Sequence, residues 1–211
     1  NTLTTGTKTV SGMDGVGPAF SSVSRVDDTT VQVTLADGVD VDETTIAASD
    51  FSLSAGSISS ISVAESGTDA TVTINLAATV DTDSLDVSIT GSIADGDGDT
   101  LTSGTKSATG MDGVAPTFSS VSRVDSTTVQ VTLADGEDVD EASVAASDFS
   151  LSTGSISSIS VAESGTDATV TINLAAAVDT DSLDVSIVGS VADTSGNTLA
   201  TGTKSVSGMD G

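Results

Sequence analysis

Short runs in which apolar and polar residues alternate recur along the whole chain. In 29–35 (TTVQVTL) and 70–76 (ATVTINL), every second residue is Val, Ile or Leu. This period of two, with β-branched residues and turn-forming residues between the runs, predicts β-strands. The first predicted set of strands is 19–26, 29–36, 49–54, 57–64, 69–76, 83–90 and 99–107.

Three segments depart from strict alternation. The imperfect pattern of 20–26 (FSSVSRV) predicts a β-bulge, and Ile58 is out of phase with the strand that follows it. Residues 41–50 (VDETTIAASD) have room for one short helical turn, and no longer helix-period segment competes with the strands.

The whole pattern is repeated once. The tetrapeptide GMDG begins at Gly12, Gly110 and Gly208, so the repeat is 98 residues long, and 80 of the 98 positions in 12–109 match those in 110–207. A unit of this length is too long for one turn of a solenoid and has the size of a small domain. Near-identity of adjacent copies is typical of a spacer and argues against catalysis.

The repeat predicts where the domains begin and end. Because the chain starts with Asn1 rather than Met, and inside a repeat, we expect it to be an excerpt of a longer tandem array. The predicted parts are 1–15 (C-terminal strand and linker of a preceding repeat), 16–109 (first repeat), 110–113 (linker), 114–207 (second repeat) and 208–211 (start of the next linker).

Seven short strands in about 98 residues predict an all-β chain of tandem immunoglobulin-like antiparallel β-sandwiches. The Cys pair and core Trp of antibody domains are absent from the sequence. Four Phe residues are predicted to lie in the cores and three Met residues to pack between domains. These residues are Phe20, Phe51, Phe118, Phe149, Met13, Met111 and Met209.

The composition is strongly acidic, with 31 Asp and Glu, five Lys and Arg, and a formal net charge of −26. This charge argues against nucleic acid and anionic membranes as partners, because its sign is wrong for both. No apolar run approaches the roughly 18 residues of a spanning helix, so we expect no direct membrane insertion. Such acidity suits a protein that lives in high salt or depends on bound cations.

Acidic residues concentrate in the loops that alternating strand directions bring to one end of each predicted sandwich. Clustered carboxylates repel unless a cation or a proton joins them, and Ca²⁺ prefers six to eight oxygen ligands. The predicted calcium ligands are Asp14, Asp40, Asp42, Asp95, Asp97 and Asp99 at the first repeat and Asp112, Asp138, Asp140, Asp193, Ser195 and Asn197 at the second. The other end of the first repeat adds Asp27, Asp81 and Asp83.

The loop 94–101 (ADGDGDTL) carries the most suggestive ligand spacing. Its counterpart 192–199 (ADTSGNTL) keeps an oxygen-bearing side chain at all three alternate positions while losing two formal charges. Zinc and copper are poor candidates because the chain has no His or Cys. The alternative interpretation is that these are ordinary Asp-Gly turns and solvated acidic surface.

Two stretches of the second repeat resemble a known class of domain. GVAPTFSSVSRVDSTTVQVTLADGEDVDEASVAASDFSL, followed by VADTSGNTL, is similar to the bacterial and archaeal immunoglobulin-like (Big-type) domains of surface-layer proteins and large adhesins. The acidic array also resembles the extender repeats of RTX-type adhesins. This resemblance implies an extracellular, cell-surface location and calcium at domain junctions. Asp97 and Asp99 make the first repeat more acidic than the usual pattern.

These observations predict a structural segment of an extracellular stalk or filament, with calcium stiffening its junctions. Its partners would be neighbouring copies of the repeat, either in tandem or as head-to-tail subunits that exchange a strand. The alternative is an adhesive module whose loops bind a glycan or a cell; domains outside this chain could also make such contacts. An enzyme is not expected, because a chain without His cannot form a Ser-His-Asp triad.

Overall fold

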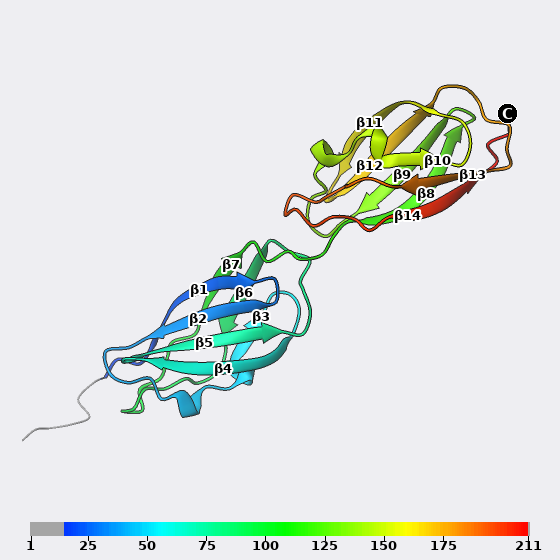
Figure 1. The fold of residues 1–211 in the computed structure, drawn as a ribbon. Helices are drawn as coiled ribbons and strands as arrows, with labels where there is room; N and C mark the ends of the chain where they lie inside the picture. Colours follow the sequence, from blue (N-terminus) through cyan, green and yellow to red (C-terminus); the bar gives the residue numbers. More distant parts are fainter. Residues whose placement is uncertain (1–14, 211) are drawn as a thin grey trace, which may run out of the picture. The chain divides into compact units, whose positions relative to one another are not determined.

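A computed structural model describes residues 15–210 (Figure 1). The first repeat forms two antiparallel sheets, with strand orders β1-β2-β5-β4 and β3-β6-β7. The strands are β1 (Ala19–Asp27), β2 (Thr30–Ala36), β3 (Phe51–Leu53), β4 (Ile58–Ser66), β5 (Asp69–Leu76), β6 (Ser84–Ile89) and β7 (Gly104–Thr109). Seven antiparallel strands in two sheets make this an immunoglobulin-like sandwich.

The second repeat forms the same fold. Its sheets have the orders β8-β9-β12-β11 and β10-β13-β14. The strands are β8 (Thr117–Asp125), β9 (Thr128–Ala134), β10 (Phe149–Leu151), β11 (Ile156–Ser164), β12 (Asp167–Leu174), β13 (Ser182–Ile187) and β14 (Gly202–Ser207). The chain is therefore all-β with tandem sandwiches, as the alternating pattern predicts.

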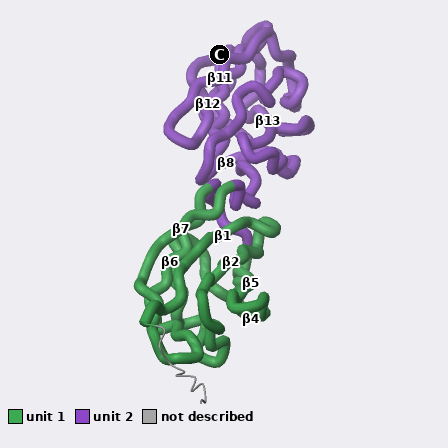
Figure 2. Tube along the Cα trace, turned by 90° about the vertical axis from the view of Figure 1, so that its left-hand side faces the viewer, with its two compact units in different colours: residues 1–78, 84–109 green, residues 79–83, 110–211 purple. Residues whose placement is uncertain are grey.

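The chain divides into two compact units (Figure 2). The first unit contains the described residues up to Ala78 together with Ser84–Thr109. The second contains Thr79–Asp83 and everything described from Gly110 onward. The segment Thr79–Asp83, which precedes β6 in sequence, thus belongs to the second unit.

Period-two patterning explains the cores. Along β5 and β12 every second residue is buried, and β2 and β9 show the same alternation. Val33 of β2 lies opposite Val72 of β5, and both side chains are fully buried. β-Branched residues pack well on such a pleated, buried face, so these central strands hold each sandwich together.

The predicted irregularities are present, with one difference. β1 has register shifts between Phe20 and Ser22 and again between Arg25 and Asp27, which confirms the bulge. The loop after β2 contains two short 3₁₀ turns, η1 (Glu43–Thr45) and η2 (Ala48–Asp50), rather than one.

The predicted strand 99–107 starts too early. β7 begins only at Gly104, because residues 99–103 continue the preceding loop. The N–H of Leu101 donates to the carbonyl of Ile93, and Thr100 forms an isolated bridge with Ala94. The loop thus folds back on itself before the strand starts.

Two predictions about large apolar residues need correction. Phe51 and Phe149 are buried, but Phe20 and Phe118 are only half-buried, at the margin of the sandwich. Met209 is fully buried within the hydrophobic core of the second unit itself, where a flexible thioether can fill a gap. Met13 lies outside the described residues.

Within residues 15–210, the structure contains no helix with the length and apolarity needed to cross a membrane.

Candidate metal centre

Three loops meet at one end of each sandwich, as the alternating strand directions predict. In the first unit the loop after β2 contacts the β4–β5 turn through Val41 N–H and Thr68 O, with N and O 3.2 Å apart. The same loop contacts the β6–β7 loop through Asp42 N–H and Ala94 O, at 3.0 Å. The equivalent bonds recur in the second unit, and we call this end of each unit the loop end.

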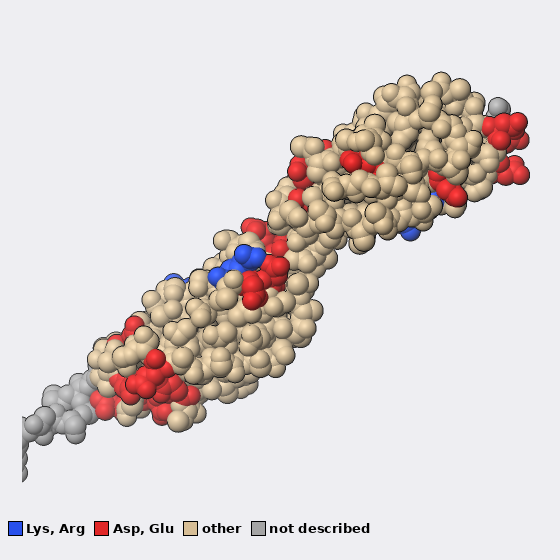
Figure 3. Space-filling view, in the orientation of Figure 1, with Lys and Arg blue, Asp and Glu red and all other residues tan. Residues whose placement is uncertain are grey.

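Acidic side chains gather at the ends of each sandwich (Figure 3). On the face in view, the surfaces over the strands are mostly neutral. Lys and Arg are too few to neutralise this charge, with five in the whole chain against 31 acids. Along the described part, Arg25 with Asp28 is the ion pair that the structure forms.

Asp95 is the most confined acid of the first unit's loop end. Its side chain is 2 % exposed, and its Oδ1 accepts the N–H groups of Asp97 and Asp99, each at 2.9 Å. Within residues 15–210, its buried Oδ2 has no hydrogen-bond partner. A buried carboxylate oxygen without a partner is costly, so this atom has an unmet need for a donor or a cation.

The second unit has the same loop with different partners. Gly98 and Gly196 both have positive φ angles, 94° and 92°, so the two loops share their backbone shape. Asp193 is again 2 % exposed, and its Oδ1 accepts the N–H of Asn197 at 2.8 Å. Its Oδ2, however, accepts the side-chain amide of Asn197 at 2.9 Å and is therefore satisfied.

Asn197 also holds Asp112, a residue of the linker. Its Nδ2 lies 3.1 Å from Asp112 Oδ2 and 3.4 Å from the carbonyl oxygen of Asp112. Asp112 is 4 % exposed, and its Oδ1 accepts the N–H of Val114. Burial raises the pKa of Asp112, and the carboxylates of Asp193 and Asp81 raise it further.

Asp135 joins the same group. Its Oδ2 is buried without a hydrogen-bond partner. Burial, followed by the charges of Asp81, Asp193 and Asp112, raises the pKa of Asp135 to about 7. Asp81 approaches this side chain because its Oδ1 accepts the N–H of the adjacent Gly136 at 3.1 Å. We call Asp81, Asp112, Asp135 and Asp193, with Asn197, the Asp112 cluster.

The raised pKa of Asp135 predicts a pH-dependent stability when no cation is bound. A carboxyl group whose pKa is higher in the folded than in the unfolded chain favours folding while protonated. In chelator, the free energy of unfolding should therefore fall as pH rises from about 4 through about 7. Urea unfolding of wild type and Asp135→Asn at pH 4, 6 and 8 measures this. An equally steep pH dependence in the Asn variant would contradict the prediction.

Asp42 and Asp140 each cap a short turn at the loop end. Asp42 Oδ1 accepts the backbone N–H and the hydroxyl of Thr44, and Asp140 Oδ1 accepts the N–H of Ala142. Both residues cap the 3₁₀ turns that follow them. In both residues the cap occupies Oδ1 of the carboxylate.

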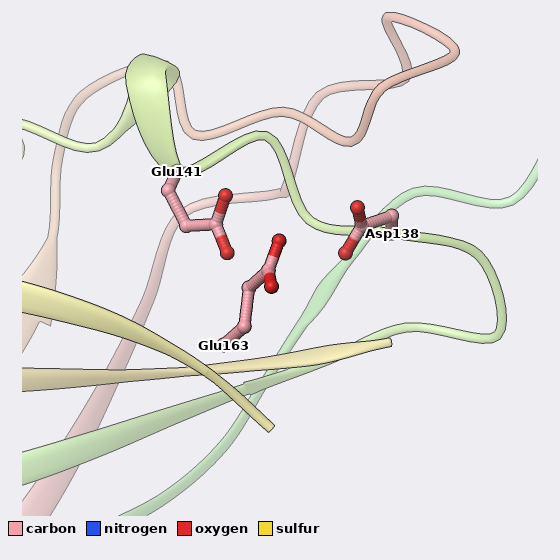
Figure 4. A group of neighbouring side chains, drawn as sticks. All are labelled: Asp138, Glu141 and Glu163. Carbon is pink, nitrogen blue, oxygen red and sulfur yellow. The ribbon is translucent and has the colours of Figure 1, made fainter. Parts of the chain in front are cut away.

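Asp138 lies in a separate group with Glu141 and Glu163. One carboxylate oxygen from each lies within 4.8 Å of the other two. Figure 4 shows the three carboxylates directed toward a common space, with Glu163 reaching it from β11. Glu141 and Asp138 raise the pKa of Glu163, and Glu141 Oε1 is buried without a partner. We call these three residues the Glu141 group.

Among the remaining predicted ligands, Asp40 and Asp97 are exposed and Asp99 is half-buried. The carbonyl of Asp40 accepts the N–H of Gly96, so this residue joins its loop to the β6–β7 loop through the backbone. Asp14 lies outside the described residues.

The predicted ligand set did not contain Glu163, and Asp81 was expected with the acids at the other end of the first repeat; Asp135 lies in a loop that was predicted to carry ligands. Glu163 is exposed at the end of β11, so its place in the strand gave no sign that it joins Asp138 and Glu141. Asp81 had no local signal, since its Oδ1 accepts the N–H of Gly136, which lies 55 residues away in the sequence.

Comparison with known proteins finds likeness to solved structures of tandem domains. No protein-family model and no curated protein sequence matches the chain. The titin I-band fragment I67–I69 is 12 % identical with a TM-score of 0.38; the match covers 90 % of this chain and 65 % of that one, just under two thirds of its length. The titin tandem A164–A165 is 10 % identical with a TM-score of 0.38, and the match covers 92 % of this chain and 98 % of that one. The D00–D0 domains of intimin are 12 % identical with a TM-score of 0.34, and the match covers 86 % of this chain and 98 % of that one.

Proposed function

We propose that the chain is a structural repeat segment of an extracellular cell-surface stalk or filament, of the adhesin-extender or surface-fibre kind, in which calcium stiffens the array. The observation that carries this proposal is the buried carboxylate at the first unit's loop end: Asp95 is 2 % exposed, and its Oδ2 has no hydrogen-bond partner among residues 15–210. Buried acids of one sign need a counter-charge, and the described residues offer them no Lys or Arg partner.

Calcium fits the donor set. The available side-chain atoms are carboxylate oxygens with a few hydroxyl and amide groups, which are the ligands of a hard divalent cation. Asp95 Oδ2 and Glu141 Oε1 are buried oxygens without donors, so each could accept a cation without breaking a hydrogen bond. The ion would neutralise part of the repulsion that a net charge of −26 creates.

The repeat supports a mechanical rather than a chemical role. Two nearly identical sandwiches differ at only 18 of 98 aligned positions, and none of those differences introduces an aromatic residue. The chain has no Trp or Tyr, and all four Phe lie within strands. A loop-based glycan site usually needs aromatic platforms, so we do not favour the adhesive alternative.

Small-angle X-ray scattering of the whole chain in calcium and in excess chelator tests the proposal. We expect a narrow distribution of interatomic distances in calcium and a broader one, with a changed maximum dimension, in chelator. Magnesium at equal ionic strength is the control, because it demands a stricter octahedral geometry than these loops offer. Identical profiles in all three buffers would remove calcium as the stiffener.

A further inference from the structure

The two loop ends compensate their buried carboxylates differently, and this difference rests on one position. The backbones of 94–101 and 192–199 are equivalent, as the matching φ angles of Gly98 and Gly196 show. Position 99 is Asp and position 197 is Asn. An ionised carboxylate only accepts hydrogen bonds, whereas a carboxamide supplies two N–H donors.

In the second unit the carboxamide is fully used. Asn197 Nδ2 lies 2.9 Å from Asp193 Oδ2 and 3.1 Å from Asp112 Oδ2, so one neutral group joins two buried carboxylates. This is the place between two anions where a cation would otherwise lie. The hydroxyl of Ser195 also favours the ionised form of Asp112, since it lowers the pKa of that carboxyl.

In the first unit both donors are replaced by acids. Asp97 stands at the position of Ser195 and Asp99 at that of Asn197, and neither side chain can donate when ionised. The consequence is visible at Asp95, which is as buried as Asp193 but whose Oδ2 has no partner. Asp37 and its counterpart Asp135 both have a buried Oδ2 without a partner among the described residues, so the difference between the units lies at Asp95 and Asp193.

We propose that Asn197 takes the place of a cation in the second unit, whereas the loop 94–101 of the first unit requires a bound divalent cation at Asp95. The inference rests on the proposed calcium-binding role and divides the repeats into two kinds. A loop with the sequence DGDGD, as in 95–99, binds the ion, and a loop with the sequence DTSGN, as in 193–197, is held together by hydrogen bonds without the ion.

A reciprocal exchange tests this inference. Asp99→Asn should remove one equivalent of Ca²⁺ from the whole chain, Asn197→Asp should add one, and the double exchange should restore the wild-type count. Isothermal titration calorimetry of the whole chain with CaCl₂ measures the stoichiometry. In excess chelator, Asp99→Asn should raise the midpoint of thermal unfolding and Asn197→Asp should lower it, because each changes the number of unpaired buried acids.

The repeats themselves provide matched charge controls. Asp28→Ser and Ser126→Asp also exchange residues between the repeats and change the net charge by the same amounts, but at an exposed turn away from the loop end. We expect these two variants to leave the number of bound Ca²⁺ ions unchanged.

The outcomes separate this inference from the proposed function. Calcium binding that does not respond to either exchange would overturn the inference and leave the calcium-stiffened stalk intact. Stoichiometry that follows the exchanges while scattering profiles stay the same in chelator would support the inference and overturn the stiffening. If the wild type binds no Ca²⁺ and Asp99→Asn does not stabilise it in chelator, both fail.

Discussion

Replacing Leu183 with alanine is expected to lower the free energy of unfolding of the second unit by about 3 kcal/mol, within the range of large-to-small core substitutions. Leu183 is fully buried on β13, the central strand of its sheet, opposite Val206 of β14. The cavity left behind should collapse only in part, because β13 is held in its sheet by β14 along its whole length and by β10 at Val185–Ile187. Urea unfolding should show the second unit's transition shifted down by about 2 M.

The equivalent change in the first unit is the matched comparison. Leu85 is also fully buried, so Leu85→Ala should shift the first unit's transition by a similar amount and leave the second unchanged. Val124 is 53 % exposed, and Val124→Thr should change either transition by less than about 0.5 kcal/mol. A Leu183→Ala chain that unfolds at the wild-type urea concentration would show that this side chain is not part of a packed core.

Replacing Gly189 with alanine is the second change with a large expected effect, a loss of about 1–3 kcal/mol from the second unit. A Cβ at this position would overlap the carboxylate of Asp148. Asp148 cannot easily move away, because its Oδ2 accepts the N–H of Ala145 at 2.7 Å and its carbonyl accepts the N–H of Val188 at 2.8 Å. The strain would act on the segment that leads from β13 into the loop 192–199. Thermal unfolding measured by circular dichroism reports the loss.

A glycine in open space serves as the control for Gly189→Ala. A Cβ added at Gly38 would have no heavy atom within 4 Å, and the φ angle of Gly38 is not in the left-handed region. Gly38→Ala should therefore leave the midpoint of unfolding nearly unchanged, whereas Gly91→Ala, against Asp50 in the first unit, should repeat the loss. Equal midpoints for Gly189→Ala and Gly38→Ala would contradict the overlap.

Much of the fold follows from the sequence because the alternation of apolar and polar residues within a few neighbouring positions decides which side chains of a strand are buried. Val31, Val33 and Leu35 alternate with polar residues, and the same three residues are buried in β2. The start of β7 could not be read in this way. Residues 99–103 are Thr-rich and suit a strand, but residues 99 and 101 form hydrogen bonds with Asp95 and Ile93 of the same loop.

The candidate site was only partly predictable for a related reason. The order of the predicted strands gives their alternating directions, and these directions bring the three loops to the same end of the sandwich. The pairing of Asn197 with both Asp112 and Asp193 does not follow, because it depends on the exact placement of a linker residue 85 positions away. The capping role of Asp42 was missed because one carboxylate can equally well cap a turn or bind an ion.

The placement of the terminal strands of the second unit has a consequence for a chain under tension. β8 pairs only with β9 and β14 only with β13, and the ladder bonds of antiparallel strands run across the strand axis. A pull applied along β8 or β14 therefore loads all the bonds of that strand together, in shear, instead of opening them one after another. With this arrangement, the second unit is expected to yield abruptly at a threshold force rather than to unravel gradually.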